Sequence, residues 1–136
     1  MRTELLTPAF NTDFVRGTVP EATDVYATGS RVICPVGTLG NGSDWDFVVL
    51  VPDLAYSILR LMADGFEDGP SMKSADLQHE VPQFASLKKE KLNLIVTSDK
   101  EFYDGFCLST RVAMALGLTM RPQRVLVFQA ILYGNG

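Results

Sequence analysis

The sequence predicts an α/β fold with a small mixed β-sheet and helices packed against it. Residues 47–51 (Phe-Val-Val-Leu-Val) form an unbroken apolar run, which is typical of a strand buried on both faces. Residues 92–97 (Leu-Asn-Leu-Ile-Val-Thr) predict a second core strand. Apolar residues recur every three or four positions in residues 54–62 and 99–116, which indicates two amphipathic helices. A length of 136 residues predicts a single domain spanning residues 1–136, and the sequence contains no internal repeat.

The N-terminal part of the chain predicts one short helix and the first strand. Thr7 followed by Pro8 fits the N-cap and the first position of a helix that ends at Gly17. One face of this helix would carry Phe10, Phe14 and Val15. After a short connection, residues 25–28 are expected to form the first core strand.

The strand at residues 47–51 is expected between a loop and a helix. One proline and three glycines in residues 35–42 disfavour a long helix after Ser30, so at most one helical turn is expected there. On the other side, Asp53 fits the N-cap of a helix that is followed by Gly65. The apolar stripe of that helix would comprise Leu54, Ile58, Leu61 and Met62. Residues 66–73 then predict a turn or a short edge segment.

The second half of the chain predicts a hairpin followed by two helices. Residues 84–87 are expected to pair antiparallel with the second core strand. Ser98 and Glu101 fit a capping box for the next helix, which Gly117 would end. Residues 119–133 predict a last helix, which we expect to be well buried because its apolar residues cover a wide arc. Those apolar residues are Val125, Leu126, Phe128, Ile131 and Leu132.

Composition excludes several classes of function. The net charge of −4 supplies no overall field that would attract nucleic acid. No apolar run approaches the ~20 residues that a membrane span needs, and the N-terminus lacks the apolar segment of a signal peptide. We therefore expect a cytoplasmic protein with no membrane partner, in which Cys34 and Cys107 are reduced thiols. The oligomeric state cannot be inferred from these features.

Two carboxylates at the start of the central strand predict a metal site. Side chains two residues apart in a strand point the same way, so Asp44 and Asp46 would lie about 6.5–7 Å apart at Cα on one face. Two such carboxylates repel each other unless a cation lies between them. Hard oxygen ligands of this kind suit Mg²⁺, which commonly binds one or two carboxylates together with substrate phosphates.

A Gly-Ser pair at the end of the preceding strand supplies a candidate phosphate site. Gly29 lets the backbone approach a phosphate closely, and the Ser30 hydroxyl can donate a hydrogen bond to phosphate oxygens. Arg31 is compatible both with phosphate binding and with pairing to a structural acid. Gly29 and Ser30 are also compatible with a plain tight turn.

These motifs together resemble the DNA polymerase β-like nucleotidyltransferase superfamily. A closer resemblance, to small bacteriophage proteins classed as nucleotidyltransferases, covers roughly residues 24–134. It is carried by residues 29–34 (Gly-Ser-Arg-Val-Ile-Cys), 44–46 (Asp-Trp-Asp), 92–99 (Leu-Asn-Leu-Ile-Val-Thr-Ser-Asp) and 128–134 (Phe-Gln-Ala-Ile-Leu-Tyr-Gly). The resemblance implies a minimal nucleotidyltransferase-like fold, and a host-cytoplasm location if the protein is encoded by a phage.

The resemblance also implies an activity and a role for each motif. It predicts transfer of a nucleoside monophosphate from a nucleoside triphosphate, bound with Mg²⁺ or Mn²⁺, to an acceptor. In this family Asp44 and Asp46 would be catalytic residues that hold the metal ions, while Gly29 and Ser30 would bind the phosphates. The acceptor is not specified and could be an RNA end, a protein or a small molecule.

Asn93 departs from the superfamily pattern. The superfamily places a third catalytic carboxylate on a later strand between apolar residues, and Asn93 occupies that context between Leu92 and Leu94. A neutral amide can bind a cation weakly through its oxygen but cannot act as a base. This leaves an alternative: a weak or inactive pseudo-nucleotidyltransferase that binds a nucleotide or a protein, related to phage anti-defence or toxin–antitoxin systems.

Other polar and aromatic residues have a structural and a functional interpretation. Trp45 must face away from its two neighbouring carboxylates, where it would be a core residue or stack on a base. Lys88, Lys89 and Lys91 form a basic hairpin tip, which is typically solvated but could contact nucleic acid. His79 is the only histidine, and no nucleophile or base partner for it is evident.

Overall fold

A computed structural model describes residues 11–29, 32, 45–68, 84–118 and 121–133 of the chain. The described strands are β1 (Asp24–Thr28), β2 (Trp45–Leu50), β3 (Glu67–Asp68), β4 (Phe84–Lys89) and β5 (Leu92–Thr97). The described helices are α1 (Thr12–Thr18), α3 (Leu54–Ala63), α5 (Lys100–Leu116) and α6 (Arg121–Tyr133). This arrangement confirms the predicted α/β class.

The strands form one mixed sheet in the order β1-β2-β5-β4-β3. β2 pairs antiparallel with β1 and parallel with β5, and β4 joins β5 in the predicted antiparallel hairpin. β3 is the short edge segment expected after α3. Every residue of β5 is buried, because this strand is central and is covered on both faces.

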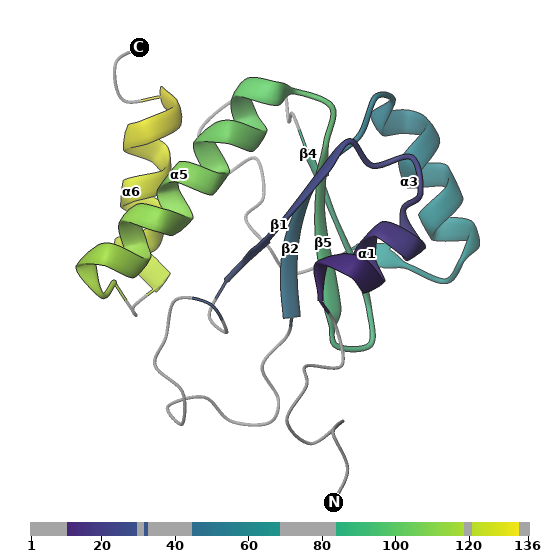
Figure 1. Cartoon of the computed structure of the whole chain (residues 1–136), viewed down its shortest axis with the longest axis horizontal. Helices are drawn as coiled ribbons and strands as arrows, with labels where there is room; N and C mark the ends of the chain where they lie inside the picture. Colours follow the sequence, from purple (N-terminus) through teal and green to yellow (C-terminus); the bar gives the residue numbers. More distant parts are fainter. Residues whose placement is uncertain (1–10, 30–31, 33–44, 69–83, 119–120, 134–136) are drawn as a thin grey trace, which may run out of the picture.

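One face of the sheet carries an unbroken apolar core beneath α1 and α3. Alternate strand residues such as Phe47, Val49 and Leu94 form this core with Leu61 of α3 and Val15 of α1. Figure 1 shows α1 and α3 on one side of the sheet and α5 with α6 on the other. Trp45 packs against the α1/α3 core, as the core interpretation predicts, so alternation in β2 places Asp46 on the opposite face.

The other face has an aromatic core beneath α5 and α6. Val48 and Ile95 pack there against a cluster that includes Phe102, Phe106 and Phe128. The Phe128 ring of α6 meets the Phe102 and Phe106 rings of α5 edge-on, with centroids 5.7 and 4.7 Å apart. These contacts connect α6 to α5, and through α5 to the sheet.

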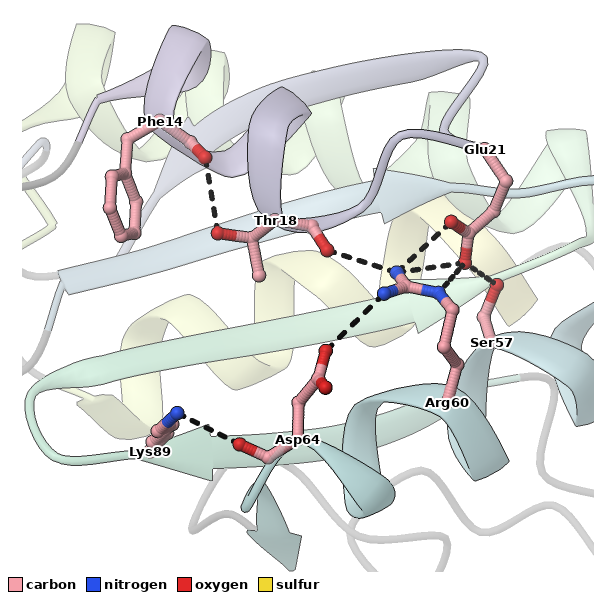
Figure 2. Close-up of polar contacts among 7 residues, drawn as sticks. All are labelled: Phe14, Thr18, Glu21, Ser57, Arg60, Asp64 and Lys89. Carbon is pink, nitrogen blue, oxygen red and sulfur yellow. Dashed lines mark hydrogen bonds and ion pairs between the residues drawn. The ribbon is translucent and has the colours of Figure 1, made fainter.

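A polar cluster connects α1 to α3. The Arg60 guanidinium of α3 donates hydrogen bonds to the Thr18 carbonyl at 2.9 Å and to the Glu21 carboxylate at 3.2 and 3.3 Å. The buried Ser57 hydroxyl donates to the same carboxylate at 2.6 Å (Figure 2). Because Glu21 follows α1 directly, these bonds hold the N-terminal segment against α3.

Helix starts agree with prediction at α3 and differ at α1 and α5. Asp53 caps α3 as expected, accepting a hydrogen bond from the Tyr56 N–H at 3.1 Å. The predicted start of the first helix at Thr7 is wrong, because extended Asn11 is the N-cap of α1. The Ser98 capping box is also wrong: the Asp99 carboxylate accepts the first N–H bonds of α5. Asp99 rather than Ser98 is the N-cap, because its carboxylate accepts hydrogen bonds from two N–H groups of the first helical turn.

Several apolar residues expected on buried helix faces are exposed. Phe14 and Met62, both predicted on the apolar faces of their helices, are 46% and 48% exposed. Met114 and Leu116, in the last turns of the amphipathic α5, are 46% and 66% exposed. The prediction that α6 is well buried is wrong at Leu126, which is 67% exposed, although Phe128 is only 2% exposed. α6 packs beside α5, and among the α6 side chains that the structure describes only Phe128 is buried in the aromatic core.

Candidate functional site

A row of four residues crosses the sheet at the end of β1 and the start of β2. In the strand register Thr28 of β1 lies opposite Asp46 of β2, and Asp46 lies opposite Asn93 of β5. Asn93 in turn lies opposite Lys88 of β4. Directly opposed residues in a sheet project to the same face. This polar row therefore lies on the α5 face, two residues along β2 and β5 from the apolar pair Val48 and Ile95.

Asp46 and Asn93 are joined by a hydrogen bond across β2 and β5. The Asn93 amide Nδ2 donates to Asp46 Oδ1 at 3.0 Å, and the Ser86 hydroxyl donates to Asn93 Oδ1 at 3.1 Å. Asn93 is only 1% exposed, whereas Asp46 is half-buried. A buried amide is stable only when its polar atoms are bonded, and these two contacts use both ends of the Asn93 side chain.

Gly29 lies directly against the Asp46 side chain. Its φ of +82° is left-handed, a conformation that other residues adopt at a cost. A Cβ built on Gly29 would lie 2.8 Å from both Cβ and Cγ of Asp46 and closer still to its Oδ2. Glycine is therefore required here for two local reasons, besides the access to phosphate inferred from the sequence. The Gly29 carbonyl accepts the Val32 N–H at 3.1 Å. The expectation of at most one helical turn after Ser30 falls mostly on residues outside the described ones.

Helix α5 borders the same end of the row. The hydroxyls of Thr28 and Thr110 share a hydrogen bond of 2.6 Å, and Thr110 also donates to the Phe106 carbonyl at 3.0 Å. Thr28 is 3% exposed and Thr110 is 2% exposed. The end of β1, and with it the Gly29 turn, is thus fixed to α5.

The structure brings together Gly29, Asp46 and Asn93, three of the residues that the sequence singled out. Asp46 and Asn93 are partners in the adjacent strands β2 and β5, and Gly29 directly follows Thr28, the last residue of β1. The other predicted site residues, Ser30, Arg31 and Asp44, lie outside the described residues, as do Cys34 and His79. In the part of the chain that the structure describes, no group of three or more His, Cys, Asp and Glu residues could hold a metal ion.

The structure distinguishes two lysines that the sequence had grouped at one hairpin tip. Lys89 lies on the α3 face, where its Nζ donates to the Asp64 carbonyl at 2.8 Å and stands 5.9 Å from the Phe66 ring centre. Lys88 is half-buried and belongs to the polar row beside Asn93. Strand alternation could have shown that Lys88 and Lys89 face opposite ways, but only the register places Lys88 in the row.

Cys107 is a buried free thiol in the aromatic core of α5. Burial raises the pKa of this thiol, although a hydrogen bond with Tyr103 and the charge of Arg111 oppose that rise. A raised pKa keeps Cys107 protonated and unreactive at neutral pH. The prediction of a reduced structural thiol is confirmed at this position.

Neither a scan against protein-family models nor a search of curated proteins gives a match to this chain. Among the helices that the structure describes, none is long and apolar enough to cross a membrane. The functional argument therefore depends on the geometry of the polar row and on the sequence motifs that flank it.

Proposed function

We propose that this chain binds a nucleoside triphosphate together with Mg²⁺ or Mn²⁺ and transfers its nucleoside monophosphate to an acceptor. The observation that carries the proposal is the position of Asp46 between the Gly29 turn and Asn93. Gly29, the Asp46 carboxylate and the Asn93 amide are far apart in sequence and lie next to one another at the ends of β1, β2 and β5. This is the placement that metal-assisted phosphate binding needs.

The Asp46 carboxylate is the kind of oxygen ligand that a hard divalent cation prefers. A triphosphate carries several negative charges, so it can lie beside the Asp46 carboxylate only if a cation separates them. Asp46 would hold that cation together with Asp44, and Gly29 and Ser30 would hold the phosphates. When bound, the cation would neutralise charge that develops on the phosphoryl oxygens. Asn93 cannot take a proton from the acceptor, so the acceptor hydroxyl must be activated by another group.

A binding module without turnover is the second candidate. The supporting observation is that Asn93 occupies the row position next to Asp46 and donates a hydrogen bond to it. A third carboxylate at this point would add a negative charge and a metal ligand, and the amide adds neither. Triphosphate binding without transfer is the expected behaviour of such a module.

Thermal unfolding of the protein with each nucleoside triphosphate, in EDTA and in Mg²⁺, tests the proposal. We expect a rise in melting temperature that requires both Mg²⁺ and a triphosphate. Asp46→Asn keeps the shape of the side chain and should abolish this rise. Asp104→Asn is the matched control, since Asp104 pairs with Lys100 on the exposed side of α5. No response of the wild-type protein to any triphosphate would contradict both candidates.

A labelled triphosphate then separates the two candidates. Transfer of the label to an RNA end, a protein or a small molecule, with release of pyrophosphate, supports the transferase. Mg²⁺-dependent binding with no transfer to any acceptor class supports the binding module.

A further inference from the structure

We propose that Asn93 is a positioning residue that holds the Asp46 carboxylate and is not itself a metal ligand. This inference deepens the proposed function, because it concerns how many charged ligands the same site offers. The Asn93 amide has a defined direction, because one of its two partners, the Asp46 carboxylate, can only accept hydrogen bonds.

The first step is the direction of the amide group. A carboxylate oxygen only accepts hydrogen bonds, so the Asn93 atom that faces Asp46 Oδ1 at 3.0 Å must be the Nδ2 donor. The Ser86 hydroxyl, on the opposite side, donates to the amide oxygen at 3.1 Å. The amide oxygen therefore points along the sheet toward β4, while the amide nitrogen points toward Asp46. A cation bound at Asp46 Oδ1 would meet the amide hydrogens, which cannot be ligands.

The second step is the rigidity of this arrangement. Asn93 is 1% exposed, and no described buried side-chain nitrogen or oxygen lacks a hydrogen-bond partner. Rotating the amide by 180° would place its oxygen against Asp46 and its nitrogen against Ser86. The first of those contacts is repulsive, so the observed direction is favoured. On its other side, Asp46 is in contact with Gly29. The carboxylate thus has Asn93 of β5 on one side and the Gly29 backbone on the other.

The third step is charge. A carboxylate in place of the Asn93 amide would lie about 3 Å from the Asp46 carboxylate, and two such groups repel strongly unless a cation lies between them. With an amide at position 93, the Asp46–Asn93 pair carries one negative charge. The two side chains can therefore lie in contact without a cation between them. The contact between Asp46 and Asn93 would therefore form without a metal ion, and Mg²⁺ would be needed only for triphosphate binding.

The experiment compares melting temperatures in EDTA and in Mg²⁺, without nucleotide. For the wild-type protein we expect no change with Mg²⁺. Asn93→Asp should melt roughly 5 °C or more below the wild type in EDTA, and Mg²⁺ alone should restore most of that loss. Asn11→Asp adds the same charge at the exposed N-cap of α1 and should not respond to Mg²⁺. An Asn93→Asp variant that does not respond to Mg²⁺ would overturn the proposal, as would a wild-type protein that Mg²⁺ alone stabilises equally.

A second variant covers the case in which Asn93→Asp folds neither with nor without Mg²⁺. Ser86→Ala removes the hydrogen bond that the Asn93 amide oxygen accepts, so the amide is held from one side only. Mg²⁺-dependent triphosphate binding should therefore weaken about fivefold. Ser109→Ala is the matched control, since this buried hydroxyl bonds only to the Phe106 carbonyl among the contacts described. Equal affinities in both serine variants would overturn the positioning role. If the wild type binds no triphosphate, the proposed function fails, yet the Mg²⁺ response of Asn93→Asp still decides this inference.

Discussion

The two faces of the sheet differ although the same strands supply both. The face beneath α1 and α3 is apolar along its length, from Val25 to Trp45 and Leu94. The face beneath α5 and α6 is apolar only at one end, and its chemistry changes within one step from Val48 and Ile95 to Asp46 and Asn93. The face beneath α1 and α3 contributes to stability alone. The face beneath α5 and α6 contributes apolar packing at one end and carries the candidate site at the other.

Their polar clusters differ in the same way. On the α3 side, Arg60 neutralises the Glu21 carboxylate directly, with Nη2 and Oε1 3.0 Å apart. On the α5 side, Asp46 accepts a hydrogen bond from a neutral amide, which orients the carboxylate without neutralising it. A carboxylate paired with a guanidinium suits a structural role, whereas a carboxylate oriented by an amide is the arrangement that the proposed cation site uses. The predictions below test whether these two roles are separable.

The largest expected effect is on the apolar face. Leu94→Ala should lower the free energy of unfolding by about 3 kcal/mol, because Leu94 is 0% exposed at the centre of the sheet. Urea denaturation measures the loss, and Leu108→Ala, at a 43% exposed position on α5, is the control with a change under ~0.5 kcal/mol. Triphosphate affinity of the folded protein should be unchanged. Loss of affinity without loss of stability would show that the two faces are coupled.

The next effect compares two left-handed glycines. Gly117→Ala should cost about 1 kcal/mol, since Gly117 has φ +67° and no atom within 4 Å of an added Cβ. Gly29→Ala should cost about 2 kcal/mol, because it adds the collision with Asp46 to the same strain. Gly29→Ala should also weaken triphosphate binding at least about tenfold, as measured by calorimetry. If both glycine variants lose the same stability and Gly29→Ala binds triphosphate as tightly as the wild type, the Asp46 side chain can move away from the added methyl group. Its observed position would then not matter for binding.

The neighbouring lysines of β4 offer a matched pair on opposite faces. Lys88→Gln should raise the Kd for a triphosphate about fivefold, and the effect should shrink at high salt because the contact is electrostatic. Lys89→Gln should leave Kd unchanged and lower stability by under ~1 kcal/mol, since its Nζ bonds the Asp64 carbonyl. The reverse assignment would contradict the placement of the site on the α5 face.

The smallest effect concerns acid stability. Burial raises the pKa of Glu21, but the hydrogen bond from Ser57 and the bond and charge of Arg60 outweigh it, so the net pKa lies below 4.5. A depressed pKa stabilises the folded state above pH 4.5, and this contribution is lost as the pH falls through the folded-state value. The stability gap between wild type and Glu21→Gln should therefore be constant from pH 6 to 8 and narrow below about pH 4.5. Thermal melts across this range measure it, and a gap that widens toward low pH would contradict the assignment.

Most secondary structure was predictable because its signals are local. The apolar runs predicted β2 and β5. Gly117, which was predicted to end the helix, is the left-handed C-cap of α5. Local signals failed where two neighbours compete for one role. Ser98 and Asp99 both precede α5, and Asp99 caps it because its carboxylate reaches the N–H groups of both Glu101 and Phe102.

The sequence by itself determined which residue types flank each strand and which way they alternate. That was enough to place Trp45 opposite Asp46 and to single out Gly29, Asp46 and Asn93. Only the tertiary structure decided that Asn93 donates to Asp46, that Gly29 touches the same carboxylate, and that Lys88 shares their row. Alternation depends on one strand alone, whereas the register between strands depends on how both faces pack, and a shift of one residue would reverse every side chain.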